Sequence, residues 1–550
     1  MTTQVRAGTA ANDDRLVDVG ALRDAYYALQ PDVSDPGQRV RVGRGGHGGS
    51  SRHGTFNEGH VLAITQAICN YRRAHGISGQ LYLGCDTHAL SEPAFMTALE
   101  VLVGNRVECV IEASGGPTPT PAVSHAVVTC NRHRASSLAD GIIITASHNP
   151  PEDGGLKYCP PHGGPAGTDD ARWIEDQANA LLARNLANVA RIPYRRARSV
   201  ATLRRHDYVG AYVSEVGSVV DLDVIRLSKL RIGVDPMGGA SIAFWRAIGE
   251  RCDLDVELVN DAVDPTFRFV PPDWDGRIRM DCASRHAMAT LIEQKDRFDI
   301  AVGNDPDAVR HGIVTRRGEL MNPNHYLALA VLYLFKHRPG WGPGAAVGKT
   351  VVSSGVIDHA AARAGRAVVE VPVGFTWLAP GLLDGSLGLA AAESAGASFL
   401  RRDGTVWTTD EDGIVFGLLA AEIMARMSRD PADLYTELMG EFGASVYERI
   451  DPPATEEEKA RLLMLSPADI KARDLAGDPI DTRMTKAPGN GVLIGGVKVV
   501  TAHGWFAARP SAAEAAYELY AESFRGRDHL RRIQEEAQAI IGRVLHGRLP

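Results

Sequence analysis

The sequence lacks the signatures of several protein classes. Its seven cysteines include no C-x-x-C pair, so neither a zinc ribbon nor a thioredoxin-like redox site is expected. There is no run of about 18 apolar residues that could span a membrane, and residues 1–18 are polar, unlike a secretory signal. Positive charge is not in excess, because 59 Lys and Arg face 67 Asp and Glu, which argues against a general nucleic-acid binder. We therefore expect a cytoplasmic protein with unpaired thiols and no membrane or nucleic-acid partner.

What the chain has in abundance is length and glycine. A chain of 550 residues exceeds one ordinary core and implies roughly three to five domains. The 57 glycines are about one residue in ten, above the average usage of about 7%, and they show no collagen-like period. Such a surplus predicts many tight turns and loops lined by backbone.

Apolar β-rich runs alternate with helical patterns along most of the chain, which predicts parallel α/β layers. Helices are expected over residues 92–103 and 322–335, and residues 511–545 are expected to form two helices separated near Gly526. Strands are expected at residues 81–83, 108–111, 141–145, 230–234, 298–302 and 350–353. Several of these runs end in Gly, Asp, Ser or Asn, and open α/β sheets bind ligands beyond such strand ends.

The strongest local motif is TASHNPP at residues 145–151, after the run 141–145. Ser147 is a candidate nucleophile, and the adjacent His148 is a candidate for proton transfer. A plain Ser/Asn/Pro turn explains the same spacing. There is no G-x-S-x-G motif to support an α/β-hydrolase.

A second motif, NDPDAVRHG at residues 304–312, places Asp305 and Asp307 two residues apart on a loop. Two such carboxylates can face one Mg²⁺ when a phosphate completes its coordination. The loop is not an EF-hand, because Val309 and Arg310 stand where that motif needs an acidic residue and a glycine. A solvated acidic turn is the alternative.

Three weaker motifs also suggest ligand contacts. Glu393 and Ser394 could bind sugar hydroxyls, although a plain loop is an equal explanation. Arg509 and Ser511 suit a phosphate at a helix start, or simply a helix cap with a surface arginine. The glycine-rich residues 43–49 could be an RGG-like RNA-binding tract, but in an acidic chain a loop approaching a ligand is the better interpretation.

Taken in order, these motifs resemble the phosphoglucomutases of the α-D-phosphohexomutase superfamily, particularly the bacterial type. The resemblance covers essentially the whole chain. It is carried by residues 87–93 (THALSEP), 118–122 (TPTPA), 140–155 (DGIIITASHNPPEDGG), 304–307 (NDPD), 311–315 (HGIVT), 322–326 (NPNHY), 393–399 (ESAGASF) and 505–511 (WFAARPS).

The resemblance implies four domains around one central cleft: three related α/β domains with mixed sheets and a C-terminal α+β domain. We place them at residues 1–205, 206–325, 326–445 and 446–550. Each would contribute one loop to the cleft. These loops would carry the phosphoserine, the metal ligands, the sugar-recognition residues and the phosphate-binding residues, in that order.

The implied reaction interconverts glucose 1-phosphate and glucose 6-phosphate, with Ser147 as phosphoserine and glucose 1,6-bisphosphate as intermediate and activator. Mg²⁺ would lie between Ser147, Asp305 and Asp307. His148 and Lys157 would act near the transferred phosphoryl group. The residues implied in substrate binding are His47, Arg310, Glu393, Ser394, Arg509 and Ser511. The partner would be a small sugar phosphate, and the chain would be a monomer or a homodimer.

The sequence departs from the family pattern in the loops expected to line the cleft. An arginine is replaced by Gly48, a metal-loop aspartate by Val309, a lysine by Thr376 and a glutamate by Ala392. A glycine and a threonine of the phosphate loop are replaced by Ala512 and Ala513, and Cys85 and Glu411 stand where relatives carry basic residues. Losing one charge stabiliser typically costs about 10²–10³ in rate. The alternative hypothesis is therefore a degenerate homologue that binds a sugar phosphate or a protein without efficient turnover.

Overall fold

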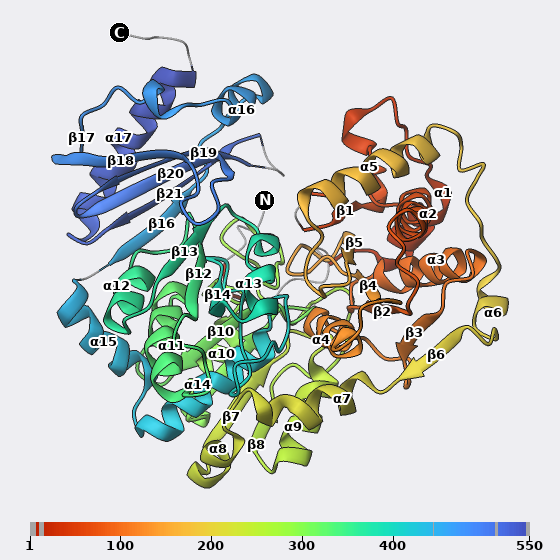
Figure 1. Cartoon of the computed structure of the whole chain (residues 1–550), viewed down its shortest axis with the longest axis horizontal. Coiled ribbons are helices and arrows are strands. Elements are labelled where there is room, and N and C mark those ends of the chain that lie inside the picture. The colour runs from red at the N-terminus through yellow and green to blue at the C-terminus, as the bar shows by residue number, and fades with distance from the viewer. Residues whose placement is uncertain (1–6, 10–15, 44, 444, 512–514, 546–550) are drawn as a thin grey trace, which may run out of the picture.

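Four β-sheets follow one another along the chain, and helices pack on them (Figure 1). The computed structural model describes residues 7–9, 16–43, 45–443, 445–511 and 515–545. The first domain lies on the right in Figure 1 and the fourth at the upper left, with the second and third between them. Four domains, three α/β and one with an antiparallel sheet, confirm the predicted fold class.

The first sheet has the order β1-β5-β4-β2-β3-β6 and carries the serine motif at its centre. Strands β4, β2, β3 and β6 are parallel, whereas β5 and β1 are antiparallel to their neighbours. Every residue of β4 is buried, as expected for a strand covered on both faces. The strands are β1 (His47–Ser50), β2 (Leu81–Cys85), β3 (Cys109–Glu112), β4 (Asp140–Ile144), β5 (Asp153–Cys159) and β6 (Leu203–His206). The helices are α1 (Val19–Ala28), α2 (Glu58–Ala74), α3 (Ser91–Gly104), α4 (Thr120–Asn131), α5 (Thr168–Leu182) and α6 (Tyr194–Ala197).

The second sheet, of order β11-β10-β9-β7-β8, presents the acidic motif at the end of its central strand. Its strands are β7 (Arg231–Asp235), β8 (Asp255–Leu258), β9 (Ile300–Asn304), β10 (His311–Thr315) and β11 (Glu319–Leu320). The accompanying helices are α7 (Tyr208–Glu215), α8 (Leu222–Ser228), α9 (Ile242–Cys252) and α10 (Ala289–Glu293).

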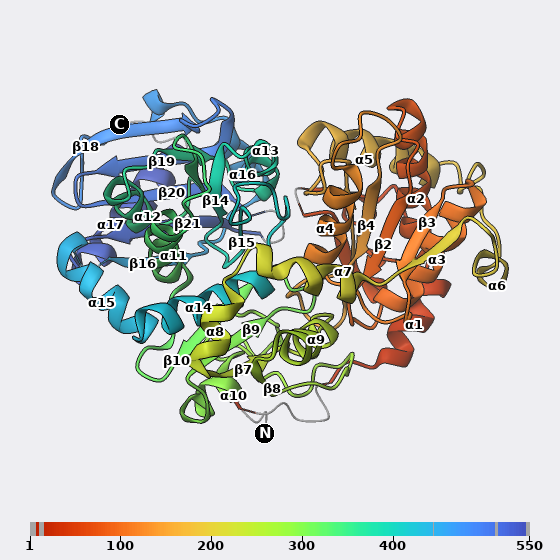
Figure 2. The ribbon, with the colours of Figure 1, turned by 60° about the horizontal axis from the view of Figure 1, so that its bottom comes forward.

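The third sheet, of order β13-β12-β14-β15, is the smallest. Its strands are β12 (Ala346–Thr350), β13 (Val368–Val371), β14 (Leu387–Ala391) and β15 (Ala397–Phe399). Its helices are α11 (Pro323–His337), α12 (Val356–Arg363), α13 (Ala379–Asp384), α14 (Gly413–Met427) and α15 (Pro431–Phe442). Helix α14 also packs against β9 and β10 of the second domain (Figure 2). One hydrophobic cluster runs through the second and third domains and includes part of the first.

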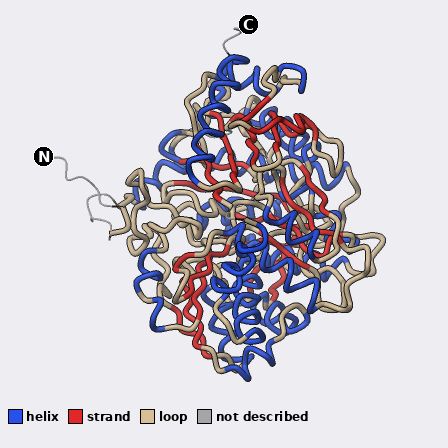
Figure 3. The backbone as a smooth tube through the Cα atoms, turned by 90° about the vertical axis from the view of Figure 1, so that its left-hand side faces the viewer, coloured by secondary structure: helices blue, strands red, loops and turns tan. Residues whose placement is uncertain are grey.

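The fourth sheet is entirely antiparallel, in the order β16-β21-β20-β19-β18-β17. Its strands are β16 (Val446–Ile450), β17 (Asp474–Leu475), β18 (Asp478–Lys486), β19 (Leu493–Thr501), β20 (Gly504–Pro510) and β21 (Tyr517–Ser523). Helices α16 (Glu456–Leu463) and α17 (Arg527–Leu545) pack on it, with α17 at the upper edge of the molecule in Figure 3. No helix in the described part of the chain is long and apolar enough to cross a bilayer.

Two local predictions are wrong. The segment expected as the first of two C-terminal helices is strand β21, because it pairs along its length with β16 and β20. The strand expected at residues 350–353 is β12, which ends at Thr350, because its parallel partners β13 and β14 align with residues 346–350. The other predicted strands and the helices at 92–103 and 322–335 are confirmed within a few residues.

Candidate active site

Ser147 lies on the loop between β4 and β5, where the first and second domains meet. Its hydroxyl donates a hydrogen bond to Asp305 Oδ2 at 2.9 Å, although the two residues are 158 positions apart. Its backbone adopts φ 55°, in the left-handed region that is costly for a residue with a Cβ. The candidate nucleophile therefore lies within hydrogen-bond distance of the acidic motif of the second domain.

Asp305 and Asp307 follow β9 and are both fully buried. Asp307 Oδ2 accepts hydrogen bonds from Lys157 Nζ at 2.8 Å and from Thr120 Oγ1 at 2.7 Å. Asp307 Oδ1 is buried and has no hydrogen-bond partner among the described residues. Asp305 Oδ1 accepts the backbone N–H of Arg310 at 2.9 Å.

The two carboxyl groups have opposite pKa shifts. Burial and the charge of Asp307 raise the pKa of Asp305 to about 7. Burial also opposes ionisation of Asp307, but Lys157 outweighs it and lowers the pKa of Asp307 to about 2. Asp307 therefore keeps its negative charge near neutral pH. Asp305 is partly protonated there, and a nearby cation would favour its ionised form.

Lys157 and His148 differ in the proton each can carry. Burial disfavours the charged form of Lys157, but Asp307 and Asp410 outweigh it and raise its pKa. Lys157 thus stays cationic and suits charge stabilisation. Burial, together with the nearby charge of Arg310, lowers the pKa of His148 well below its usual value, so its ring is neutral near pH 7.

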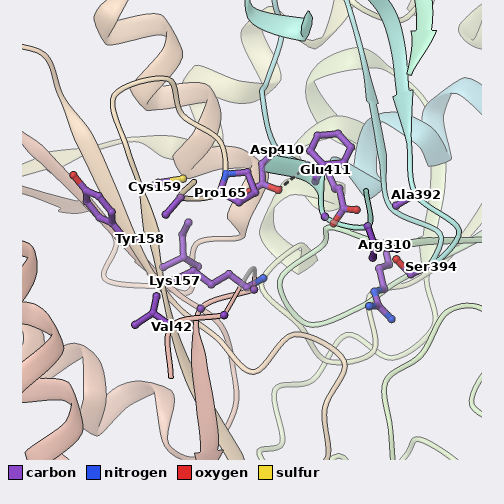
Figure 4. A pocket seen from close by; sticks show the side chains of 18 of the residues that line it. Val42, Lys157, Tyr158, Cys159, Pro165, Arg310, Ala392, Ser394, Asp410 and Glu411 are labelled. Carbon is purple, nitrogen blue, oxygen red and sulfur yellow. Dashed lines mark hydrogen bonds between the residues drawn. The ribbon is translucent and has the colours of Figure 1, made fainter. Parts of the chain in front are cut away.

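A cavity opens beside Lys157, between the first and third domains (Figure 4). In Figure 4, Lys157 reaches in from one side, Arg310 and Ser394 lie on the other, and Asp410 and Glu411 lie between them. Glu393 also lines this cavity, and its Oε2 accepts a hydrogen bond from Thr350 Oγ1 at 2.9 Å. The cavity thus contains cations suited to a phosphate and carboxylates suited to hydroxyl groups.

Three of the predicted substrate-binding residues lie elsewhere. The ring of His47 is buried in the first domain, 6.0 Å from Phe56 and 4.9 Å from His60 between ring centroids. It is the backbone of the glycine-rich loop, at Gly43, Gly45 and Gly46, that lines the cavity. Arg509, at the end of β20, lies 3.6 Å from a carboxylate oxygen of Glu518.

Ser511 follows β20, and its backbone N–H bonds to Ala516 at 3.1 Å. Like Arg509, it does not line this cavity. The substituted positions Ala512 and Ala513 of the same loop lie outside the described residues, as does Arg44 of the glycine-rich loop.

Of the other departures, Ala392 and Glu411 line the cavity, and Val309 is buried. Burial and Asp410 raise the pKa of Glu411 to about 8, so this carboxyl group is largely protonated at neutral pH. Gly48 lies in β1 opposite Gly155. Within the described residues, no cluster of three or more His, Cys, Asp or Glu side chains is arranged to hold a metal.

Family models match three segments of the chain. They are described as phosphoglucomutase/phosphomannomutase α/β/α domains I, II and III, and they match residues 39–184, 210–318 and 322–442, respectively. The chain belongs to the phosphoglucomutase/phosphomannomutase family. A curated family member, the phosphoglucomutase of Komagataeibacter xylinus, is 54% identical over 535 residues, which are 97% of this chain and 96% of that protein.

Solved structures of the family share the fold. The phosphoglucomutase parafusin from Paramecium, in an open form, superposes with a TM-score of 0.73 at 18% identity, covering 94% of this chain and 96% of that one. A phosphoglucomutase/phosphomannomutase family protein from Burkholderia thailandensis gives 0.69 at 19% identity, covering 92% and 98%.

Reasoning from the sequence missed two parts of this family site. Thr120, whose hydroxyl donates a hydrogen bond to Asp307, lies inside the TPTPA motif, for which the sequence predicts no role in the site. Asp410 lines the cavity and its side chain is only 6% exposed. The run of three acidic residues that it begins is the signal in the sequence that points to it.

Proposed function

We propose that this chain is a phosphoglucomutase that interconverts glucose 1-phosphate and glucose 6-phosphate through a phosphoryl group on Ser147. The single observation that carries the proposal is the hydrogen bond between Ser147 and Asp305 within an otherwise buried set of charged groups. The 54% identity to a phosphoglucomutase over 97% of the chain supports the same reaction.

In the proposed reaction, a free hydroxyl of the sugar phosphate attacks the phosphoryl group of phosphorylated Ser147. The new O–P bond forms on the sugar as the Oγ–P bond breaks, which gives glucose 1,6-bisphosphate. The neutral ring of His148 takes the proton of the attacking hydroxyl as the bond to phosphorus forms, and passes it to Ser147 Oγ as that oxygen leaves. The bisphosphate then returns its other phosphoryl group to Ser147, and the proton goes back to the oxygen that leaves. Lys157 stays cationic and stabilises the charge that builds on the phosphoryl oxygens.

The residues at the junction fit a Mg²⁺ ion. Ser147, Asp305 and Asp307 would hold it, because Asp307 has an unpartnered buried oxygen and Mg²⁺ needs only one or two carboxylates when a phosphate is present. When bound, the metal supplies positive charge that favours in-line phosphoryl transfer.

Substrate recognition is proposed to use the cavity beside the junction. Arg310 would bind a phosphate, and Glu393 and Ser394 would bind sugar hydroxyls, since all three line the same cavity as Lys157. His47, Arg509 and Ser511, which lie outside this cavity, stay in the proposal as substrate-binding residues, with His47 acting through the backbone of the glycine-rich loop that it follows. A cytoplasmic location, glucose 1,6-bisphosphate as activator, and a monomeric or homodimeric state are also part of it.

The test is turnover of glucose 1-phosphate with Mg²⁺ and a trace of glucose 1,6-bisphosphate. Wild type should turn over, and Ser147→Ala should lose activity and the mass of one phosphoryl group on the intact chain. Ser523→Ala is the matched control, because it also removes one serine hydroxyl, here one that bonds to His529 within the fourth domain. A wild-type rate equal to that of Ser147→Ala would leave only the degenerate homologue. The close relationship to a phosphoglucomutase along the whole chain argues against that alternative.

A further inference from the structure

Asp86 is a buried carboxylate at the end of β2 that the proposed reaction does not use. Its Oδ1 accepts hydrogen bonds from the backbone N–H of His88 at 2.9 Å and from Ser91 Oγ at 2.5 Å. Its Oδ2 accepts from His88 Nδ1 at 2.8 Å, from Thr145 Oγ1 at 2.6 Å and from the N–H of Ala146 at 3.3 Å. Oδ1 thus bonds to the loop that follows β2, whereas Oδ2 bonds both to that loop and to the two residues that precede Ser147.

His88 reaches the far end of the same loop. Its Nε2 lies 3.1 Å from the carbonyl oxygen of Asn149, while its Nδ1 faces Asp86. Both ring nitrogens face acceptors, so a doubly protonated ring satisfies both, and the charge of Asp86 raises the pKa of His88 despite its burial. Together the two side chains hold the loop on either side of Ser147.

The loop needs such support because its backbone is strained. A serine at φ 55° is in a sparsely populated backbone conformation, which persists only where the surroundings determine it. The N–H of Ser147 donates to Thr145 Oγ1 at 2.8 Å, and the same hydroxyl donates to Asp86. Thr145 therefore relays the position of Asp86 to the backbone of Ser147.

The second domain braces the same region. The N–H of Met280 donates to the carbonyl oxygen of His148 at 3.1 Å. The ring of Phe267 lies 4.9 Å from that of His88 between centroids. These contacts bury the pair and exclude water from its hydrogen bonds, which makes each bond stronger than it would be at the surface.

We propose that Asp86 and His88 are positioning residues that fix the Ser147 loop at both ends and hold Ser147 in its left-handed conformation. The inference rests on the proposed function of Ser147, but the conformation itself can be measured without turnover.

The direct variant is Asp86→Asn, which replaces an acceptor oxygen with a donor and removes the partner of His88. Because this change also leaves a buried imidazolium unpaired and could prevent folding, Thr145→Val is the decisive variant. It keeps the shape of the side chain but breaks the link between Asp86 and the N–H of Ser147. Thr145→Ser keeps the hydroxyl and should rescue. Thr97→Val is the matched control, because Thr97 is equally buried in the first domain and bonds to Tyr26 and Pro93 instead of the loop.

In steady-state assays, kcat of Thr145→Val should fall by roughly 10–10²-fold, with KM for glucose 1-phosphate changed by less than about twofold. Thr145→Ser and Thr97→Val should stay within about threefold of wild-type kcat. In amide hydrogen exchange, peptides covering residues 145–149 should exchange at least about tenfold faster in Thr145→Val than in Thr97→Val.

Unchanged exchange of this loop in Thr145→Val, or an equal loss of kcat in Thr97→Val, would overturn the inference. A wild-type chain without turnover would instead count against the proposed function, and the exchange rates would still decide whether Asp86 and His88 hold the loop.

Discussion

The buried ring of His311 makes the folded chain sensitive to acid. His311 begins β10 and is 1% exposed, and in the part of the chain that the structure describes neither of its ring nitrogens has a hydrogen-bond partner. The ring stacks on Phe416 at 4.8 Å and meets the edge of Tyr326 at 5.4 Å between centroids. Burial alone lowers its pKa to about 3.

The size of the effect follows from proton linkage. In the unfolded chain an ordinary histidine has a pKa of about 6.5, so between pH 3 and 6.5 unfolding takes up one proton at His311. The contribution of His311 to the free energy of unfolding is therefore fully present above pH 6.5 and is lost as the pH falls from 6.5 to 3. Between pH 8 and pH 5 the loss from this one ring is about 2 kcal/mol.

The perturbation is His311→Leu, which fills a similar volume and removes the proton site without breaking a hydrogen bond. Urea unfolding at pH 8 and pH 5, followed by the fluorescence of the buried Trp245 and Trp407, gives the free energy of unfolding at each pH. The loss between the two pH values should be about 2 kcal/mol smaller in His311→Leu than in wild type. The same loss in both would refute the reasoning. Exposed His53→Gln serves as the control and should behave as wild type.

Three more outcomes are expected. Arg72→Met should destabilise the chain by about 3–5 kcal/mol in the same urea titration, because it leaves the fully buried Asp140 without its cationic partner. Adding Asp140→Leu should recover most of this loss, and no recovery would contradict the account. Lys157→Met should lower kcat by about 10²–10³ with an unchanged far-ultraviolet circular dichroism spectrum, because it removes the cation beside Asp307; full activity would rule out charge stabilisation by Lys157. Dialysis against EDTA should abolish turnover and added Mg²⁺ should restore it, whereas undiminished activity without divalent ions would exclude the metal.

The sequence predicts the fold well where local pattern and burial agree. The isoleucines at residues 142–144 form a strand buried on both faces, and residues 322–335 follow a helical pattern that becomes α11. Residues 517–523 mislead because Ala, Glu and Leu favour helix, yet pairing with β16 and β20 makes them a strand. The pairing of β21 with β16 joins residues as far apart in sequence as Val446 and Ser523, which local patterns cannot reveal.

The candidate site was predictable as a set of residues but not as an arrangement. Ser147, Asp305 and Asp307 could be named from motifs, and the structure places them together. The ring of His47 shows the limit, because a residue directly after a ligand-facing loop can turn its side chain into the core. The lowered pKa of Asp307, too, depends on Lys157, which lies 150 positions before Asp307 in the sequence.

The bond from Ser147 to Asp305 spans two domains, and this matters during synthesis of the chain. The serine leaves the ribosome long before the acidic loop, so the first domain alone offers an incomplete phosphoryl site. In the proposed reaction, phosphorylation of Ser147 uses Asp305 and therefore requires residues up to Arg310, whose N–H bonds to Asp305, to have folded against the first domain. A phosphoryl group on the serine would thus mark a chain whose first two domains have already assembled.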